Sequence, residues 1–168
     1  IISNAGGVNP QACAEAVRAE IREQELDLKV AVVLGDDLSA RAGEFAGETE
    51  MFTGEPFPDP DSLASINAYL GAFPIAAALD EGADIVITGR CVDSAVTLGA
   101  CIHAFAWARD DWDRLAAGSL AGHIIECGPQ ATGGNLTDWE SVADSLADVG
   151  YPIVEVGEDG SFDVSKPA

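Results

Sequence analysis

The stretch from Gly82 to Gly99, GADIVITGRCVDSAVTLG, limits the fold more than any other part of the sequence. Residues 83–88 are apolar and mostly β-branched apart from one aspartate. This pattern is typical of a strand buried on both faces of a parallel sheet, because helices then cover both sides and no polar alternation is needed. Polar residues and a new helical periodicity follow. Such a strand-to-helix turn lies at the carboxyl edge of the sheet, where open α/β folds bind their ligands.

Two further apolar strands are predicted at residues 1–4 and 28–34, joined by a helix at residues 10–24. Pro10 stands in the first turn of that helix, where its missing N–H is not needed. A strand, helix and strand in this order form a right-handed crossover of two parallel strands. Further helices are predicted at residues 63–81, with a bend at Pro74, at residues 93–106, with Asp93 as the N-cap, and at residues 110–126 and 138–146.

The end of the chain has a different pattern. Residues 152–156 and 161–164 flank a turn with glycines at both ends, which predicts a β-hairpin. We therefore predict one α/β domain over residues 1–168, with a mostly parallel sheet, helices on both faces and a hairpin extension at residues 151–164. Because the chain opens on a strand without an initiating methionine, we expect it to be a fragment of a longer protein.

Residues 38–62 contain three prolines between positions 54 and 61, which exclude a regular helix or a central strand there. A loop of this length is uncommon inside a compact domain and is often functional. We expect a lid over a site, or an arm that contacts another part of the protein.

Acidic residues dominate the charge: 29 aspartates and glutamates stand against eight lysines and arginines, for a net charge of -21. Binding of nucleic acid or of an anionic membrane needs a basic face, so neither partner is expected. No apolar run approaches the ~20 residues that cross a bilayer, and the start has no basic segment before an apolar one, so we predict a cytoplasmic protein. Both adaptation to a salty cytoplasm and an acidic surface without special meaning would explain the charge.

Polar residues follow each of the three predicted strands. If these strands are parallel neighbours, the loops that follow them meet at one edge of the sheet and form one crevice. The residues expected there are Asn4, Asn9, Asp36, Asp37, Arg90 and Asp93.

Arg90 is a candidate for binding an anion, because a guanidinium group offers a planar fork to a carboxylate or a phosphate. The alternative is a structural salt bridge to Asp93 or to another acid. Asp36 and Asp37 are candidates for acid–base catalysis or for holding a hard cation. Adjacent residues point in two directions, so a helix cap beside a solvated carboxylate is an equal alternative.

The pair Gly6-Gly7 precedes the first predicted helix. Glycine lets the backbone approach a ligand closely, and the free N–H groups of a helix start suit a phosphate or a carboxylate. The spacing matches neither G-x-G-x-x-G nor the Walker pattern, so the cofactor is left unknown. A turn with no other role is an equal alternative.

His123 and Glu126 lie three residues apart in a predicted helix, on one face. This spacing can supply two metal ligands. The sequence shows no third ligand beside them, and His103 lies twenty residues away. A capping or core role is therefore preferred, and no metal is predicted.

Five motifs occur in a fixed order along the chain. They are SNAGGVNP at 3–10, TGRCVDSA at 88–95, DWDRLAAG at 111–118, AGHIIECG at 121–128 and TGG at 132–134. Together they resemble the acyclic terpene utilisation AtuA family over residues 1–135. Members of that family are longer at both ends, which also implies a fragment. Cys91 and Val92 stand where related sequences often carry other small residues.

The resemblance implies a link to bacterial catabolism of citronellol-type terpenes or related acyl-CoA acids. It also implies a shared site. The residues carried over are Asn4, Gly6, Gly7, Asn9, Gly89, Arg90, Asp93, His123, Glu126, Thr132, Gly133 and Gly134.

We predict a cytoplasmic catabolic enzyme domain that acts on an anionic small molecule, such as a terpenoid or an acyl-CoA-derived carboxylic acid. Arg90 and the Gly6-Gly7 loop would hold the anion, and one of Asp36, Asp37 and Asp93 would move the proton, as in a lyase or hydratase. One alternative is a noncatalytic subunit or scaffold. Another is a metal-dependent hydrolase that uses the two adjacent aspartates and His123. Association with a second copy or a partner subunit is expected.

Overall fold

A computed structural model of the chain describes residues 1–167. The chain divides into two compact units. Unit 1 comprises residues 1–70 and 83–91, and unit 2 comprises residues 71–82 and those from 92 onward. The stretch from Gly82 to Gly99 therefore contributes its strand to one unit and its helix to the other.

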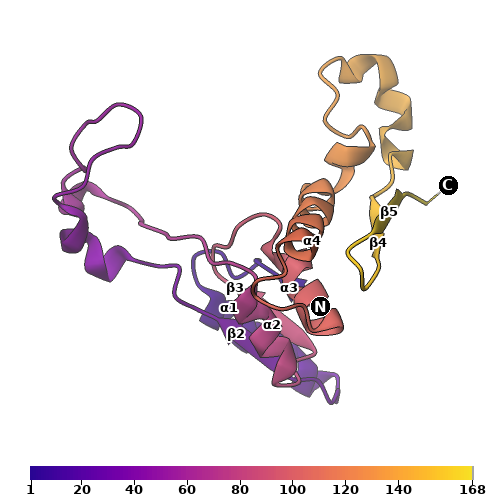
Figure 1. The fold of residues 1–168 in the computed structure, drawn as a ribbon, viewed down its shortest axis with the longest axis horizontal. Helices are drawn as coiled ribbons and strands as arrows, with labels where there is room; N and C mark the ends of the chain where they lie inside the picture. The colour runs from indigo at the N-terminus through magenta and orange to yellow at the C-terminus, as the bar shows by residue number, and fades with distance from the viewer. Residues whose placement is uncertain (168) are drawn as a thin grey trace. The chain divides into compact units, whose positions relative to one another are not determined.

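The sheet of unit 1 has three parallel strands: β1 (Ile2–Ser3), β2 (Val30–Val33) and β3 (Ile85–Thr88), in the order β1-β3-β2. Strands β2 and β3 are labelled in Figure 1. The central strand β3 comes from the apolar run, and its last three residues are buried. All three predicted strands are present and parallel, so the α/β class is confirmed.

Helix α1 (Pro10–Glu23) follows β1 and packs against β2 and β3. It begins where the sequence predicts, because Pro10 occupies the first turn and the Asn9 side chain accepts the N–H of Ala12 at 3.0 Å. Ala14 and Ile21 form its buried face. A helix layer on the second face of the sheet stays a prediction.

Residues 38–65 form a long connection, here called the arm, between β2 and the rest of unit 1 (Figure 1). It contains two 3-10 helices, η1 (Ser39–Phe45) and η2 (Pro60–Ser62). Met51 and Phe52, between them, are 83% and 86% exposed. Apart from these two short 3-10 helices, the described residues of the arm form no helix or extended strand, as the prolines in the sequence indicate.

The helix predicted at residues 63–81 is wrong over its first half. Helix α2 (Phe73–Asp80) begins ten residues later, with Pro74 in its first turn rather than at a bend. The preceding residues instead make tertiary backbone hydrogen bonds: the N–H of Leu38 donates to Ile66 O at 2.8 Å, and the N–H of Ala68 donates to Asp36 O at 2.8 Å. These bonds compete with helix formation, and they place residues 66–70 beside the carboxyl ends of the strands.

Unit 2 is built on α2, α3 (Ala95–Phe105) and α4 (Trp112–Ile125), which pack α2 on α3 and α3 on α4. The N-cap of α3 is Ser94, and not Asp93 as the sequence suggests. Ile75 of α2 is fully buried and packs against Gly99 of α3.

The remainder of unit 2 follows α4. It holds the 3-10 helices η3 (Gly128–Thr132) and η4 (Trp139–Asp148), and the second replaces the α-helix predicted at residues 138–146. Strands β4 (Ile153–Val156) and β5 (Phe162–Ser165) pair antiparallel, so the C-terminal hairpin is confirmed. Strand β4 contacts α4.

Within residues 1–167, no helix combines the length and the apolar character that spanning a membrane requires.

Candidate functional site

A cleft of about 960 Å³ opens in unit 1 at the carboxyl ends of the parallel strands. Its lining comes from the loops after β1, β2 and β3, together with residues 64–69 of the chain that returns from the arm. The three loops therefore meet at one edge of the sheet. Of the predicted site residues, the cleft brings together Gly7, Asn9, Asp36, Asp37 and Arg90.

Asp36 is buried, with 4% of its surface exposed, and two hydrogen bonds hold its carboxylate. Atom Oδ2 accepts the backbone N–H of Arg90 at 2.8 Å and the side-chain amide of Asn67 at 3.1 Å. Both of these bonds end on Oδ2, and Oδ1 accepts none from the described residues. Because no buried side-chain oxygen of these residues lacks a hydrogen-bond partner, Oδ1 reaches solvent and is the oxygen through which Asp36 can meet a ligand in the cleft.

Arg90 lies two residues after the end of β3 and is exposed in the cleft. Its guanidinium donates a hydrogen bond from Nη2 to the Tyr69 hydroxyl and also lies over the Tyr69 ring, 4.7 Å from the centroid. Tyr69 thereby orients the cation by a hydrogen bond and a cation–π contact.

Asp37 is exposed at the same edge. The hydroxyl and the backbone N–H of Ser39 hydrogen-bond its carboxylate and hold the pKa of Asp37 below its usual range. The cleft thus carries two carboxylates of different kind. Asp36 is buried and fixed from two sides, whereas Asp37 is solvated and stays ionised at neutral pH.

The start of α1 adds a hydrogen-bond donor to the cleft. Pro10 has no N–H, and Asn9 takes the N–H groups of Ala12 and Cys13. Among the described residues, this leaves the N–H of Gln11 as the donor of the first turn that the chain itself does not use. Gln11 lines the cleft, so this group can serve a ligand.

Three other predicted residues of unit 1 lie near the cleft but do not line it. Asn4 accepts the N–H of Gly7 through its carbonyl at 3.1 Å, and Gly6 is buried against Pro10. Gly89 packs on the Asp36 carboxylate, since a Cβ there would lie 2.2 Å from Oδ1. These residues shape the loops.

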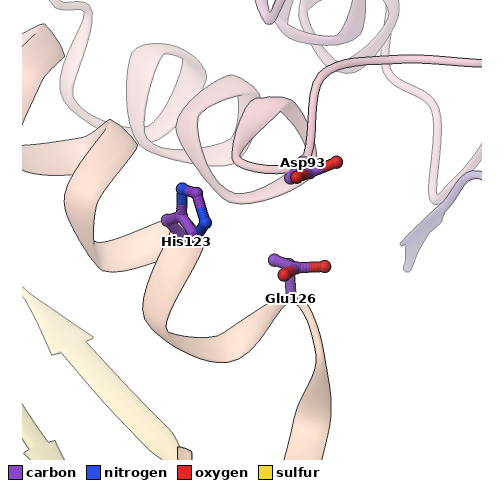
Figure 2. Close-up of side chains that lie close together, drawn as sticks. All are labelled: Asp93, His123 and Glu126. Carbon is purple, nitrogen blue, oxygen red and sulfur yellow. The ribbon is translucent and has the colours of Figure 1, made fainter. Parts of the chain in front are cut away.

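A second cluster lies in unit 2 and joins Asp93, His123 and Glu126 (Figure 2). Asp93 comes from the turn before α3, His123 from the last turn of α4, and Glu126 is the C-cap of α4. One ligand atom of each lies within 4.8 Å of the others, and all three residues are exposed. Asp93 is thus the third potential ligand that the sequence does not reveal.

Cys127 adjoins this cluster, and the negative charges of the cluster affect the pKa of its thiol. A hydrogen bond with Glu126, followed by burial and by the charges of Glu126 and Asp93, raises the pKa of the Cys127 thiol. No lysine or arginine forms an ion pair with these carboxylates within the described part of the chain.

Thr132, Gly133 and Gly134 end η3 in unit 2. The Thr132 hydroxyl donates to Gly150 O at 2.6 Å and the Gly134 N–H to Pro129 O at 2.7 Å. Gly133 is the C-cap, with φ of 108°. The bonds within this motif close a turn.

Sequence reasoning missed Asn67, Tyr69 and Gln11 as lining residues. The first two lie in the stretch predicted as helix, and a helix would not place them at a sheet edge. The motif SNAGGVNPQ does contain a signal for Gln11, because it directly follows the first-turn proline.

The family model described as acyclic terpene utilisation family protein AtuA matches residues 1–168. No curated protein and no solved structure matches the chain.

Proposed function

The chain belongs to the acyclic terpene utilisation AtuA family, and we propose that unit 1 binds an anionic small molecule as part of a cytoplasmic catabolic enzyme. Family membership suggests a role in acyclic terpene utilisation. The proposed ligand is a terpenoid or an acyl-CoA-derived carboxylic acid. The proposed reaction moves a proton, as in a lyase or a hydratase.

The position of Arg90 carries this proposal. Of the residues that line the cleft, it is the one with a positive charge, and it stands at the carboxyl end of the central strand. Ligands of open α/β folds bind at this edge. A guanidinium oriented by Tyr69 offers a carboxylate two parallel donors, a geometry that a lysine does not offer.

The first turn of α1 supports the same ligand class. The N–H of Gln11 points from a helix of 14 residues, and the partial positive charge of a helix start stabilises an anion. Arg90 and Gln11 both line the cleft. The attraction of an anion to Arg90 and to the start of α1 would oppose its repulsion by the nearby aspartates.

Asp36 and Asp37 are the proposed proton carriers. Both line the cleft, and a carboxylate within hydrogen-bond reach of a substrate carbon acid acts as a general base. Asp37 has a lowered pKa, so it is ionised at neutral pH and can accept but not supply a proton there. Asp36 is held by Arg90 and Asn67 and presents a fixed oxygen. Asp93 belongs to unit 2 and has no role in this proposal.

We expect the variant Arg90→Ala to weaken binding of the anionic ligand by roughly 10- to 100-fold, the loss of one charge-assisted contact. The variant keeps the backbone N–H that supports Asp36. The measurement is the ligand-induced rise in melting temperature of the protein across acyl-CoA thioesters and dicarboxylates, since a ligand of the native state raises its stability.

The matched control is Arg22→Ala, which removes the same charge from the exposed end of α1 and should leave binding unchanged. Arg90→Lys keeps the charge without the fork and should give an intermediate affinity. Equal binding by the wild type and Arg90→Ala would reject the proposal, and so would a wild type that no anion stabilises.

A second candidate function, a noncatalytic subunit or scaffold, is favoured by the arm. Met51 and Phe52 expose large apolar side chains there, and such residues commonly mark a contact with another protein. If the arm serves assembly, the double variant M51S/F52S is expected to convert an oligomer into monomers in sedimentation velocity. The paired change Met51→Leu with Phe52→Tyr should preserve the oligomer. A wild type that sediments as a monomer would remove this candidate.

A further inference from the structure

The cluster of Asp93, His123 and Glu126 is not used by the proposed function of unit 1. It offers two carboxylate oxygens and one imidazole nitrogen from two segments that lie thirty residues apart in sequence. These ligand atoms lie within 4.8 Å of one another, and Figure 2 shows the three side chains around a common space. Two ligands of one ion lie no more than about 4.4 Å apart, because each metal–ligand bond measures about 2.0–2.2 Å. These exposed side chains therefore need only a small rotation to reach one ion.

The backbone around the cluster holds these side chains close. Gly122 directly precedes His123, and Ser94 directly follows Asp93. A Cβ on Gly122 would lie 2.8 Å from Ser94 O and 3.0 Å from Ser94 Cα. Only a glycine allows α4 to approach the start of α3 this closely, so the contact places both ligand-bearing segments side by side.

The spacing within α4 completes the set. His123 and Glu126 are three residues apart, so their side chains leave the end of the helix on one face. That face is the one opposite Asp93. Two carboxylates this close repel each other at neutral pH, and no basic side chain of residues 1–167 is paired with them. A bound cation would remove the repulsion.

We propose that Asp93, His123 and Glu126 bind one divalent transition-metal ion. An imidazole favours ions such as Zn²⁺ over Mg²⁺ and Ca²⁺, and the carboxylates also admit Mn²⁺. Three protein ligands leave at least one coordination position open for water or for a substrate oxygen, as in catalytic rather than structural metal sites. All three groups are exposed, so the open position faces solvent. The proposal concerns unit 2 and holds whether or not the cleft of unit 1 binds an anion.

The first test is calorimetric titration of the whole metal-depleted chain with ZnCl2. We expect one Zn²⁺ per chain, and at least a tenfold loss of affinity in His123→Gln and in Glu126→Gln, because loss of a direct ligand should cost no less than the 10- to 100-fold known for outer-shell partners. The matched control is His103→Gln. His103 is also exposed, and its Nδ1 lies 2.6 Å from the Asp80 carboxylate. The control variant therefore removes an imidazole beside a single carboxylate, and it should leave the Zn²⁺ affinity unchanged.

A second measurement reports the site directly, even if a variant folds poorly. The chain has two histidines, so its proton spectrum contains two sets of imidazole signals. Substoichiometric Mn²⁺, which is paramagnetic, should broaden the signals of His123 and spare those of His103. Equal broadening of both rings, or Zn²⁺ binding that Mg²⁺ matches in affinity and stoichiometry, would show only diffuse attraction to an acidic chain and would overturn the proposal.

Discussion

Replacing Gly89 with alanine is expected to lower the free energy of unfolding by about 2–3 kcal/mol, at the upper end of the cost of overpacking a buried site. The added Cβ would lie 2.2 Å from Asp36 Oδ1 and 2.5 Å from its Cγ. Asp36 cannot simply turn aside, because its Oδ2 holds the N–H of Arg90 and the amide of Asn67. Either the carboxylate moves and breaks these bonds, or β3 moves.

The measurement is urea unfolding of the variant and the wild type, compared by their midpoints at constant slope. Gly47→Ala is the matched control, because a Cβ on this arm glycine would meet no atom within 4 Å. Its stability should change by less than about 1 kcal/mol, and in the stabilising direction. If both variants unfold at the wild-type midpoint, the tight packing of Asp36 on Gly89 does not exist in solution.

The Gly89 variant also bears on ligand binding. Arg90 follows Gly89 directly, and its backbone bond to Asp36 ties the cation to the buried carboxylate. Displacing Asp36 therefore disturbs a proposed anion-binding group and a proposed proton carrier together. We expect Gly89→Ala to lose the ligand-induced rise in melting temperature even at temperatures where it is folded, whereas Gly47→Ala keeps it.

The sequence was sufficient to predict the core of unit 1 for a physical reason. A strand buried on both faces needs apolar residues without alternation, so residues 83–88 identify the central strand β3. Pro10 marks the start of α1 by local chemistry alone. The terminal hairpin follows from its glycine-bounded turn.

The sequence was insufficient where tertiary bonds override local preference. Residues 63–72 have a helical pattern, yet the N–H groups of Ala68 and Leu70 donate to Asp36 O and Arg90 O instead. This pairing carries Asn67 and Tyr69 to the cleft, where one supports a carboxylate and the other orients a cation. No periodicity within the segment encodes such partners.

The sequence was also insufficient to group Asp93 with His123 and Glu126 as metal ligands. His123 and Glu126 are recognisable by their spacing within one helix, whereas Asp93 belongs to a different segment and looks like an N-cap. What unites them is the approach of α4 to the start of α3. That approach depends on Gly122, whose role cannot be read from the sequence because its partner Ser94 is distant along the chain.

Gly122→Ala is therefore expected to cost stability and metal affinity together. Its Cβ would meet backbone atoms of Ser94, which cannot rotate away as a side chain would, so α4 must shift. We expect a loss of about 1–3 kcal/mol in the free energy of unfolding. We also expect at least a tenfold loss in Zn²⁺ affinity. A metal ion requires its bond lengths to lie within a narrow range, and a small displacement of His123 and Glu126 from Asp93 moves the ligands out of that range.

The control separates these two effects. Gly71→Ala adds a methyl group in unit 2 where no atom lies within 4 Å, and it should preserve both stability and Zn²⁺ affinity. Titration of Gly122→Ala with Zn²⁺ well below its melting temperature isolates the geometric effect from unfolding. A destabilised variant that binds Zn²⁺ like the wild type would mean that side-chain flexibility, rather than the contact between Gly122 and Ser94, brings the ligands together. A variant with unchanged stability would contradict the close approach itself.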